Sequence, residues 1–556
     1  MVYTLRDFEQ EMSRRSTVGL VDVLRTKLIL GKSTIRSQLD AMVRKEILST
    51  IMLLVEGPNT RVLVNHKLPT EILTLIFDYV RLQPRKRDTP GTSIWDPVVV
   101  RVDWLVRASH VCRHWRAIIV DTPALWDRID DPQRRLDHVR VPAERARILP
   151  LALSMKSEPT RPMNALLQSN KPIRELRYYG ITIKLSQKYL QQPAYLLESL
   201  SLTGTPGRTT TGHARRPSGG YPVQVFRGHT PSLRRLSLDS LNWIPTLQTS
   251  TLTHLYLADC YGRKLLQRVL ALLSASPSLT DLVLVDRGDV LHHEDPQGNA
   301  LVHLRHLRRL VLKHMSSAGV KRFISHIRLD PETCVRLINV LPLDGDLLNQ
   351  LSRLPLNAGA TKLMIKGSGT RRTVVYEGQS SGILIDHFTS LGEDWGTALP
   401  RMLAMDQLRE LHVVLRDSPA LFASTPTTLF DFLHRAPALE HLYVDTQGLM
   451  SLLDALECCR SKPPKLACPN VVLHVQMPCR GPGSDSTSLI QSFAARQTNL
   501  GIRHLVAEYC PGCGAGARRR PWFSREIQVN FESVTSMSNP RLGRDWRMLR
   551  VDWPAC

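Results

Sequence analysis

Apolar residues recur at helical spacing through the first sixty residues of the chain. Ser33 can cap a helix, and the Gly-Pro-Asn run at residues 57–59 stops it. Between them, apolar residues follow one another mostly at intervals of three and four: Ile35, Leu39, Met42, Val43, Ile47, Ile51 and Leu54. The pattern predicts an N-terminal helical extension over residues 1–60, which either packs on the segment that follows or forms a short coiled coil.

A second apolar segment starts at Leu68. Pro69 suits the first turn of a helix, where its missing N–H costs nothing, and Glu71 lies near the positive end of the helix dipole. Seven apolar side chains follow between Ile72 and Val80, so this helix is apolar on most of its sides. Such a helix must be covered on two faces, by its own domain and, we expect, by a partner.

A polar segment rich in Arg, Lys and Pro follows over residues 83–92, and the whole insert before the next predicted helix spans about 83–102. A second helix is predicted to begin near Asp103 and to end at the Asp-Thr-Pro run of residues 121–123. One face of this helix carries Trp104, Ala108, Val111, Cys112, Trp115 and Ile119. A further element then begins at residue 124.

Three blocks in this region together resemble the F-box. They are Leu-Pro-x-Glu-Ile-Leu-x-x-Ile-Phe at 68–77, Ser-x-Val-Cys-Arg-x-Trp-Arg at 109–116 and Pro-x-Leu-Trp at 123–126. Their order and residue types match, over about 60 of the 556 residues. The resemblance implies an F-box-like domain over 61–130 that binds a Skp-type adaptor. The insert is longer than a compact F-box needs, and it resembles variants found in F-box proteins of mushroom-forming fungi.

The same resemblance implies an adaptor-docking surface. Its expected residues are Leu68, Pro69, Ile72, Leu73, Ile76, Phe77, Val111, Cys112, Trp115, Leu125 and Trp126. Several of them, such as Trp115, are expected to serve the core of the domain as well as the interface. The sequence does not separate these two roles.

A short motif recurs from residue 166 to residue 510: Leu, two variable residues, Leu, one variable residue, then Leu or Val. Copies start at Leu197, Leu233, Leu252, Leu279, Leu307, Leu408 and Leu439, and weaker ones at 173, 470 and 502. Spacings are 27 residues from 252 to 279, 28 from 279 to 307 and 31 from 408 to 439. Periods of this size are typical of solenoids in which each copy pairs a short strand with a return segment.

This array resembles leucine-rich repeats in irregular form. Cys260 occupies the ninth position of its copy, where such repeats carry Asn or Cys. Residues 316–407 lack clear copies, although 335–343, 362–365 and 382–385 are candidate degenerate strands. The expected fold class is therefore α/β: an N-terminal all-α F-box-like module, a linker at 131–165, an α/β leucine-rich-repeat-like solenoid over 166–510 and a basic tail over 511–556.

The variable position inside each predicted strand should face away from the apolar interior. A solenoid of this kind presents such positions as an extended binding surface. Candidates for contact with a protein substrate are Ser237, Tyr256, His412 and Tyr443, within a wider row that includes Ser201, Val283 and Val311.

Composition adds a bias toward acidic partners. Hydrophobic residues make up 42% and charged residues 22%, near globular averages, but the formal net charge is +23. Such a surface attracts acidic proteins and nucleic acid. The basic residues are widely spread, and zinc-finger, basic-zipper and RNA-recognition signatures are absent, so the sequence favours acidic proteins over nucleic acid.

Cysteine content and hydropathy indicate the compartment. Ten cysteines in 556 residues are too sparse for a disulfide scaffold, and the charged start of the chain is unlike a secretory signal. The longest early apolar stretch, residues 47–55, is far shorter than the roughly 20 residues of a membrane span. We expect reduced thiols, a cytosolic or nuclear protein and no membrane partner.

Catalytic and metal-binding signatures are not found in convincing form. The chain has no P-loop, no Gly-x-Ser-x-Gly elbow and no His-Glu-x-x-His. The His-His-Glu-Asp run at 292–295 reads as a solvated loop, and the Cys510/Cys513 pair has no second pair to complete a zinc site. We therefore expect no catalytic residues, no metal and no cofactor, and Cys510 falls at the ninth position of the motif copy that starts at residue 502.

The sequence thus predicts a non-catalytic adaptor. Resemblance to F-box proteins implies the substrate-recognition subunit of an SCF-type (Skp–cullin–F-box) ubiquitin ligase, reaching a cullin and RING subunit through the Skp-type adaptor. The repeat array would present a protein substrate whose identity the sequence does not give. The alternatives are an F-box scaffold that works without a cullin, and a basic nucleic-acid-associated protein.

Overall fold

A computed structural model describes the greater part of the chain between Leu68 and Ser533. The described residues are 68–84, 98–100, 102–131, 137–156, 158–205, 223–262, 264–287, 301–340, 344–355, 359–368, 371–378, 380–388, 399–400, 402–414, 432–458, 471–476, 492–493, 504–509 and 528–533. They fall into two compact units, residues 68–181 with 188–197, and residues 182–187 with 198–533. The predicted extension over 1–60 lies outside the described residues.

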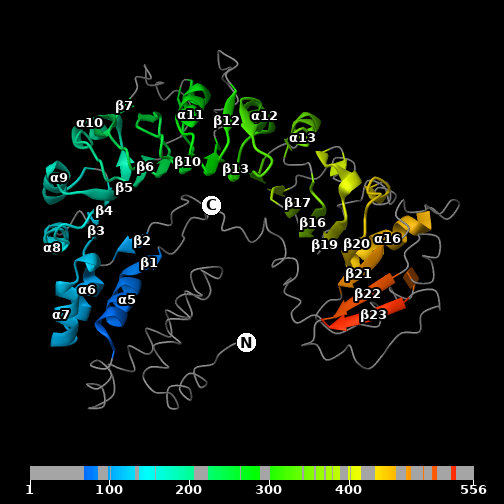
Figure 1. Cartoon of the computed structure of the whole chain (residues 1–556), viewed down its shortest axis with the longest axis horizontal. Coiled ribbons are helices and arrows are strands. Elements are labelled where there is room, and N and C mark those ends of the chain that lie inside the picture. The colour runs from blue at the N-terminus through cyan, green and yellow to red at the C-terminus, as the bar shows by residue number, and fades with distance from the viewer. Residues whose placement is uncertain are drawn as a thin grey trace. The chain divides into compact units, whose positions relative to one another are not determined.

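The first unit begins with a group of short helices (Figure 1). They are α5 (Thr70–Arg81), α6 (Val102–Ser109), α7 (Arg113–Asp121) and the 3-10 turn η1 (Pro123–Leu125). Helix α5 starts directly after Pro69, as predicted, and packs against α6, α7 and η1. Strands β1 (Leu82–Pro84) and β2 (Val98–Val100) pair antiparallel near the two ends of the insert, and so hold these two ends together.

The single helix predicted over residues 103–121 is wrong, because the chain breaks into α6 and α7 at residues 110–112. Cys112 has an extended backbone, with φ −156° and ψ 167°, and forms the N-cap of α7. Its Sγ accepts a hydrogen bond from the backbone N–H of Trp115 at 3.4 Å. The thiol thus takes the capping role that Ser or Asp usually fills, and this local bond favours a new helix start over continuation.

The rest of the first unit alternates strands and helices. Its elements are β3 (Arg128–Asp130), α8 (Asp137–Arg145), β4 (Leu151–Lys156), α9 (Arg161–Gln168) and β5 (Ile173–Ile181). Strands β3, β4 and β5 pair in parallel order. Residues 131–165, expected as a linker, therefore contain regular structure, with the inward side chains of β4 at most 1% exposed at Leu151, Leu153 and Met155.

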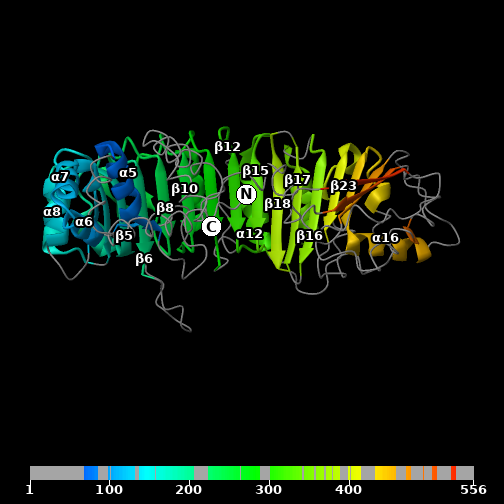
Figure 2. The ribbon, with the colours of Figure 1, turned by 90° about the horizontal axis from the view of Figure 1, so that it is seen from below.

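The second unit is dominated by one large, mostly parallel sheet. Its first strands are β6 (Ser199–Gly204), β8 (Arg235–Asp239), β10 (His254–Ala258), β11 (Asp281–Val285), β13 (Arg309–Lys313) and β15 (Cys334–Ile338). Each pairs in parallel with the next in this order. Figure 2 shows these strands side by side. The predicted motif copies at 197, 233, 252, 279 and 307 supply β6, β8, β10, β11 and β13.

The motif leucines form continuous ladders across these strands. In register, Leu200 lies opposite Leu236, which lies opposite Leu255, and the row continues through Leu282 and Leu310. All five are 0% exposed. Each fully buried leucine contributes about 1.5–3 kcal/mol of burial free energy, so a one-residue slip of register, which would turn every leucine outward, is strongly disfavoured.

Return segments place helices over one face of the sheet. Helices α11 (Leu265–Ser274), α12 (Ser317–Ser325) and α13 (Gly345–Ser352) lie on the same side of the strands in Figure 1. Smaller elements are α10 (Ile183–Tyr189), η2 (Phe226–Gly228) and the parallel pairs β7 (Val223–Gln224) with β9 (Pro245–Thr246) and β12 (Val302–Leu304) with β14 (Ile327–Leu329).

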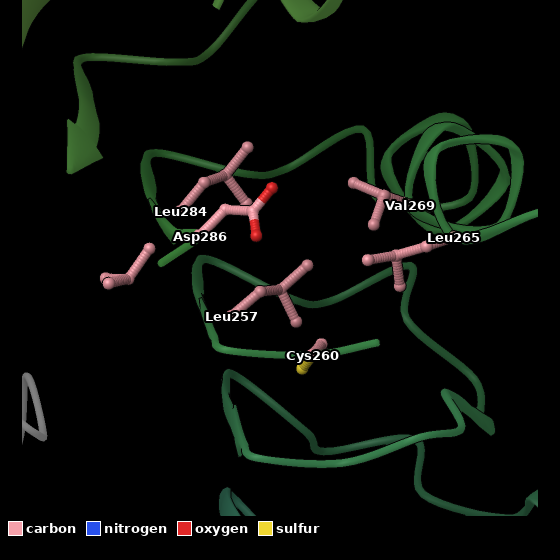
Figure 3. Close-up of a pocket in the computed structure, with 7 residues that line it drawn as sticks. Leu257, Cys260, Leu265, Val269, Leu284 and Asp286 are labelled. Atoms are coloured by element: carbon pink, nitrogen blue, oxygen red, sulfur yellow. The ribbon is translucent and has the colours of Figure 1, made fainter. Parts of the chain in front are cut away.

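The layer between strands and helices is well filled. Val269 and Leu265 of α11 face Leu257 and Leu284 of the sheet (Figure 3). The cavity between them measures about 20 Å³, which holds at most a water-sized molecule. Cys260 lies in the same layer, 6% exposed, and its thiol donates to the carbonyl of Leu238 on the preceding strand at 3.7 Å.

An antiparallel excursion interrupts the parallel order. Strand β15 pairs not with β16 (Lys362–Ser368) but with β18 (Gly382–Phe388), while β17 (Arg371–Glu377) lies antiparallel between β16 and β18. The spatial order is therefore β15, β18, β17, β16, β19. Strands β15, β16 and β18 fall on the three candidate strands proposed for residues 316–407, and β17 was not expected.

Parallel order resumes after the turn η5 (Met405–Gln407). The strands are β19 (Glu410–Val414), β20 (His441–Asp445), β21 (Val472–Gln476), β22 (His504–Tyr509) and β23 (Gln528–Ser533), with α16 (Thr446–Cys458) packed against β19, β20 and β21. Each pairs in parallel with the next. Strand β23, the described part of the expected tail over 511–556, is thus regular structure. Within the described ranges, no helix has the length and apolar character needed to cross a membrane.

Candidate functional site

Helix α5 has a buried apolar face made by residues four apart. Leu73 is 1% and Phe77 4% exposed. The ring of Phe77 meets the indole of Trp115 on α7 edge-to-face, with centroids 5.0 Å apart and an interplanar angle of 69°. Aromatic pairs in this geometry contribute about 0.5–1.5 kcal/mol beyond the area they bury. This face fixes α5 to α7.

A second apolar face of α5 is only partly covered. Ile72 and Ile76, four residues apart, lie on one side of the helix, Leu68 lies just before its first turn at the same spacing, and all three are half-buried. Pro69 is exposed at the start of the helix. Leu75 lies beside this stripe and is 53% exposed. The helix therefore presents a row of aliphatic side chains suited to a partner, as its all-round apolar sequence predicts.

Behind α5, the third sequence block forms a rigid support. Leu125 and Trp126 are each 1% exposed. The indole Nε1 of Trp126 donates to the carbonyl of Ile119 at 2.7 Å, and the guanidinium of Arg145 lies 4.4 Å from the centroid of its ring. Side chains this deeply buried hold the position of the surface residues rather than touching a partner in this conformation.

Residues 66–131 match the family model described as F-box-like. The helical module is F-box-like. The match covers the three blocks and the insert, and it supports an F-box protein. No curated protein matches the chain.

The structure separates the predicted docking residues of the F-box-like module into two groups. Buried ones are Leu73, Phe77, Trp115, Leu125 and Trp126; accessible or half-buried ones are Leu68, Pro69, Ile72, Ile76, Val111 and Cys112. Val111 is 47% exposed because it lies in the turn between α6 and α7. Burial thus assigns a supporting role to the first group and leaves the second group as the surface.

Among the described residues of the F-box-like module, two large exposed apolar side chains are absent from the predicted set. Leu75 on α5 and Val106 on α6, 44% exposed, both face solvent. The signal for Leu75 was present in the sequence, because an apolar run this dense leaves more side chains than one interior can hold. Exposed Arg107, Arg113 and Arg116 on α6 and α7 add positive charge, which favours an acidic partner surface.

The four residues expected on the substrate-facing row of the sheet differ in accessibility. Ser237, Tyr256 and His412 are 2%, 1% and 4% exposed, whereas Tyr443 is half-buried. Ser237 and Tyr256 lie opposite each other in the ladder of β8 and β10, and His412 and Tyr443 in that of β19 and β20. In this conformation only Tyr443 of the four is open to direct contact.

Around Tyr443 the structure forms a column of rings that the sequence only partly indicated. His412, Tyr443 and His474 occupy the same position on β19, β20 and β21. Ring centroids are 4.1 Å apart in both pairs, with interplanar angles of 5° and 15°. His441 joins the column from the side, its Nδ1 lying 3.3 Å from Nε2 of His474. The sequence analysis did not include His474, because only the pairing register of β20 with β21 shows that His474 lies beside Tyr443.

The charged groups beside the column are paired. Burial raises the pKa of Glu410, but a hydrogen bond from Nε2 of His412 at 2.5 Å and the ammonium of Lys362 at 3.1 Å outweigh it and hold this pKa to about 2. Asp445 accepts the backbone N–H of Gly448 at 2.8 Å, which caps the start of α16. Glu410 is therefore paired with a cationic group, and Asp445 is held by the first turn of α16.

Cysteine and metal chemistry is limited in the described part of the chain. Cys112, Cys260 and Cys334 are free thiols. Burial raises the pKa of the Cys260 thiol to about 12, which makes it a poor nucleophile. Among the described residues, no group of three or more His, Cys, Asp or Glu side chains is arranged to hold a metal ion. Residues 292–295, Cys510 and Cys513 lie outside the described residues.

Proposed function

We propose that the chain is the substrate-recognition subunit of an SCF-type ubiquitin ligase. Its F-box-like module binds a Skp-type adaptor, and the adaptor connects it to a cullin and a RING subunit. The observation that carries this proposal is the half-covered stripe formed by Ile72 and Ile76 on α5, the first described helix of the F-box-like match, together with Leu68 just before it. A stripe of this kind on a helix fixed from behind by Trp115 is suited to helix-in-groove docking.

The second part of the proposal is that the large sheet is an irregular leucine-rich-repeat solenoid that presents a protein substrate. Support comes from the leucine ladders, from helices packed on one face and from the Cys260 thiol bonded to the preceding strand. The opposite strand face would then meet the partner, with the accessible Tyr443 as its candidate contact among the four predicted residues. We place the protein in the cytosol or nucleus, where its free thiols stay reduced.

In this role the chain performs no covalent chemistry. Holding a substrate close to a charged conjugating enzyme raises the effective concentration of the substrate lysine, which makes a bimolecular encounter effectively intramolecular. The F-box-like module and the sheet belong to different compact units, so docking and substrate binding use separate surfaces of the chain.

Adaptor capture tests the proposal directly. The variant carries Leu68→Asp, Ile72→Asp and Ile76→Asp, which places three charges on the stripe and leaves the buried face of α5 intact. Loss of three apolar contacts of about 1–2 kcal/mol each should weaken binding to a purified Skp-type adaptor at least about hundredfold. Normal adaptor binding by this variant, folded by circular dichroism, would refute the docking assignment.

A matched control distinguishes this surface from general loss of surface hydrophobicity. Tyr261→Asp, Leu301→Asp and Met450→Asp change three apolar side chains that are 41%, 56% and 42% exposed on the sheet unit. Adaptor binding should be unchanged in the control. Capture from cell extract then decides the larger assembly: recovery of adaptor with cullin supports the ligase, whereas adaptor without cullin points to a scaffold.

A further inference from the structure

The sheet face that carries no described helix is closed to water at its centre. Helices α11, α12 and α13 lie on one face of the strands in Figure 1, and we call the other face the far face. On the far face, Tyr256 of β10 lies beside Val283 of β11, which lies beside Val311 of β13. These three side chains are 1%, 1% and 0% exposed. Ala258 and Val285 extend this far-face patch and are 3% and 5% exposed.

The strands alone do not account for this burial. Ser201 of β6 and Tyr443 of β20 hold the equivalent position nearer the two ends of the sheet, and both are half-buried. Neighbours on one strand face shield the flanks of a side chain but leave its end open, so the patch needs a second layer over it. Parallel strands that read as unbroken apolar runs, like Leu-Val-Leu-Val at 282–285, are typically covered on both faces.

The second layer comes from outside the described residues. Among the described helices and strands of this unit, none lies over the far face of β10, β11 and β13 (Figure 2). Residues 205–222 and 288–300, which follow β6 and β11, are mostly polar and unsuited to an apolar patch. The two terminal segments, 1–67 and 534–556, are therefore the candidates.

The C-terminal segment has the side chains that such a patch needs. Within eight positions it carries five large apolar residues, two of them tryptophans: Trp546, Met548, Leu549, Val551 and Trp553. Tryptophan buries a large area on a rigid side chain and is enriched at the buried centre of interfaces. Residues 546–553 thus match the patch in apolar character.

The same segment is also long enough. Adjacent strands lie about 4.8 Å apart, so β13, β11 and β10, which are nine, ten and eleven strand positions from β23, lie about 43, 48 and 53 Å from it along the sheet. An extended chain spans about 3.3–3.6 Å per residue, so residues 546–553 reach up to about 43–72 Å from Ser533. The reach of the apolar residues therefore includes all three strands.

We propose that residues 546–553 lie across the far face of β10, β11 and β13 and bury the far-face patch. This inference rests on the proposed function, because it concerns the regulation of the surface that presents the substrate. A substrate that uses the patch must displace this segment, which competes at an effective concentration set by its tether. The apparent affinity for such a substrate is then reduced by the fraction of molecules in which the segment is released.

Hydroxyl-radical oxidation of Tyr256 in the full chain, detected by mass spectrometry, tests the proposal. The tail variant carries Trp546→Asp, Leu549→Asp and Trp553→Asp, which removes three apolar contacts and leaves the sheet sequence unchanged. Oxidation of Tyr256 should rise at least about tenfold, because its exposed fraction rises from 1% to that of a half-buried side chain. Tyr443, already half-buried on the same face, should change by less than about twofold.

A matched variant tests the other terminal segment. Ile47→Asp, Ile51→Asp and Leu54→Asp make the same kind of change on the apolar stripe of the predicted N-terminal extension. Tyr256 should stay protected in this variant. Oxidation of Tyr256 that rises here, and not in the tail variant, assigns the cover to the N-terminal extension and overturns the proposal.

A synthetic peptide with the sequence of residues 541–553 separates displacement from unfolding. At saturating concentration it should refill the open patch of the tail variant and return Tyr256 oxidation to within about twofold of wild type. A peptide with the same three Asp substitutions should have no effect. Oxidation caused by misfolding would not be reversed in this way.

Two further outcomes overturn the proposal. They are a Tyr256 that is as protected in the tail variant as in wild type, and an exposed Tyr256 that the peptide does not protect. Adaptor capture by the F-box-like module does not involve these strands. Failure here with normal adaptor capture therefore leaves the docking proposal standing.

Discussion

Trp126 offers the sharpest test of how the F-box-like module is held together. Its indole is 1% exposed, donates from Nε1 to the carbonyl of Ile119 at 2.7 Å and carries the guanidinium of Arg145 on its face. The substitution Trp126→Phe keeps an aromatic face and removes the N–H together with one ring. It therefore tests how much the contacts of Trp126 stabilise the C-terminal end of α7, where Ile119 lies.

The expected cost follows from these contacts. Leaving the buried carbonyl of Ile119 without its donor costs about 1–3 kcal/mol. Removing the second ring leaves a partial cavity, which adds about 1–2 kcal/mol because a complete Trp→Ala change costs about 3–5 kcal/mol. The contact with Arg145 weakens by less than about 1 kcal/mol, since phenylalanine also offers a π-face. Together these contributions sum to about 2–6 kcal/mol.

Amide hydrogen exchange, detected by mass spectrometry, measures the loss of stability of α7 locally and does not require the whole chain to unfold in one step. Peptides covering α7 should lose protection by about 30- to 20,000-fold, since 1.4 kcal/mol corresponds to a factor of ten. Trp104→Phe, at a half-buried indole of α6, is the matched control and should change protection of α7 by far less. If Trp126→Phe leaves the protection of α7 within about threefold of wild type, the anchoring role of Trp126 is refuted.

Other predictions concern the sheet unit. Leu236→Ala removes a 0% exposed rung of the ladder and should cost about 2–5 kcal/mol, seen as a lower melting temperature; an unchanged value would contradict the ladder. Burial raises the pKa of the Cys260 thiol to about 12, so in the native protein it should react with iodoacetamide far more slowly than the half-buried Cys112. Equal alkylation rates, measured by mass spectrometry, would contradict the packing around Cys260. Burial raises the pKa of Glu410, but His412 outweighs it and lowers this pKa from 4.5 to about 2, so the ionised carboxylate stabilises the fold above about pH 4.5 and loses this effect as the pH falls toward 2. The deficit in melting temperature of Glu410→Gln at pH 7 should therefore shrink on acidification, and a constant deficit would contradict the pairing.

Much of this architecture was predictable because the buried apolar residues recur along the sequence at the spacing of the strands and helices that they build. The strands β6, β8, β10, β11 and β13 lie on motif copies, since each Leu-x-Leu places two side chains on the same face of a strand. The two-faced helix α5 was predictable for a related reason. Its apolar residues exceed what one helix face can bury, and the structure covers one face fully and the other in part.

Other features depend on contacts that the chain order does not contain. The break between α6 and α7 rests on the Cys112 thiol acting as a cap, whereas the apolar spacing alone continues through it. The strands within residues 131–165 rest on pairing with neighbours, because a single short strand carries a weak periodic signal. The column of His412, Tyr443 and His474 rests on register, which aligns residues about 30 positions apart.

The excursion through β16, β17 and β18 has a consequence for how the sheet forms. In a simple array, each new strand docks on the one just made, and order spreads from neighbour to neighbour. Here β16 is three strand positions, about 14 Å, from β15, and its place is bridged only when β18 returns to pair with residues 334–338. Three strands must therefore assemble as a unit before the sheet can continue. The antiparallel strands β16, β17 and β18 thus separate two stretches of parallel sheet. Unfolding that begins at β23 and spreads from strand to strand should therefore stop at these three strands before it reaches β15.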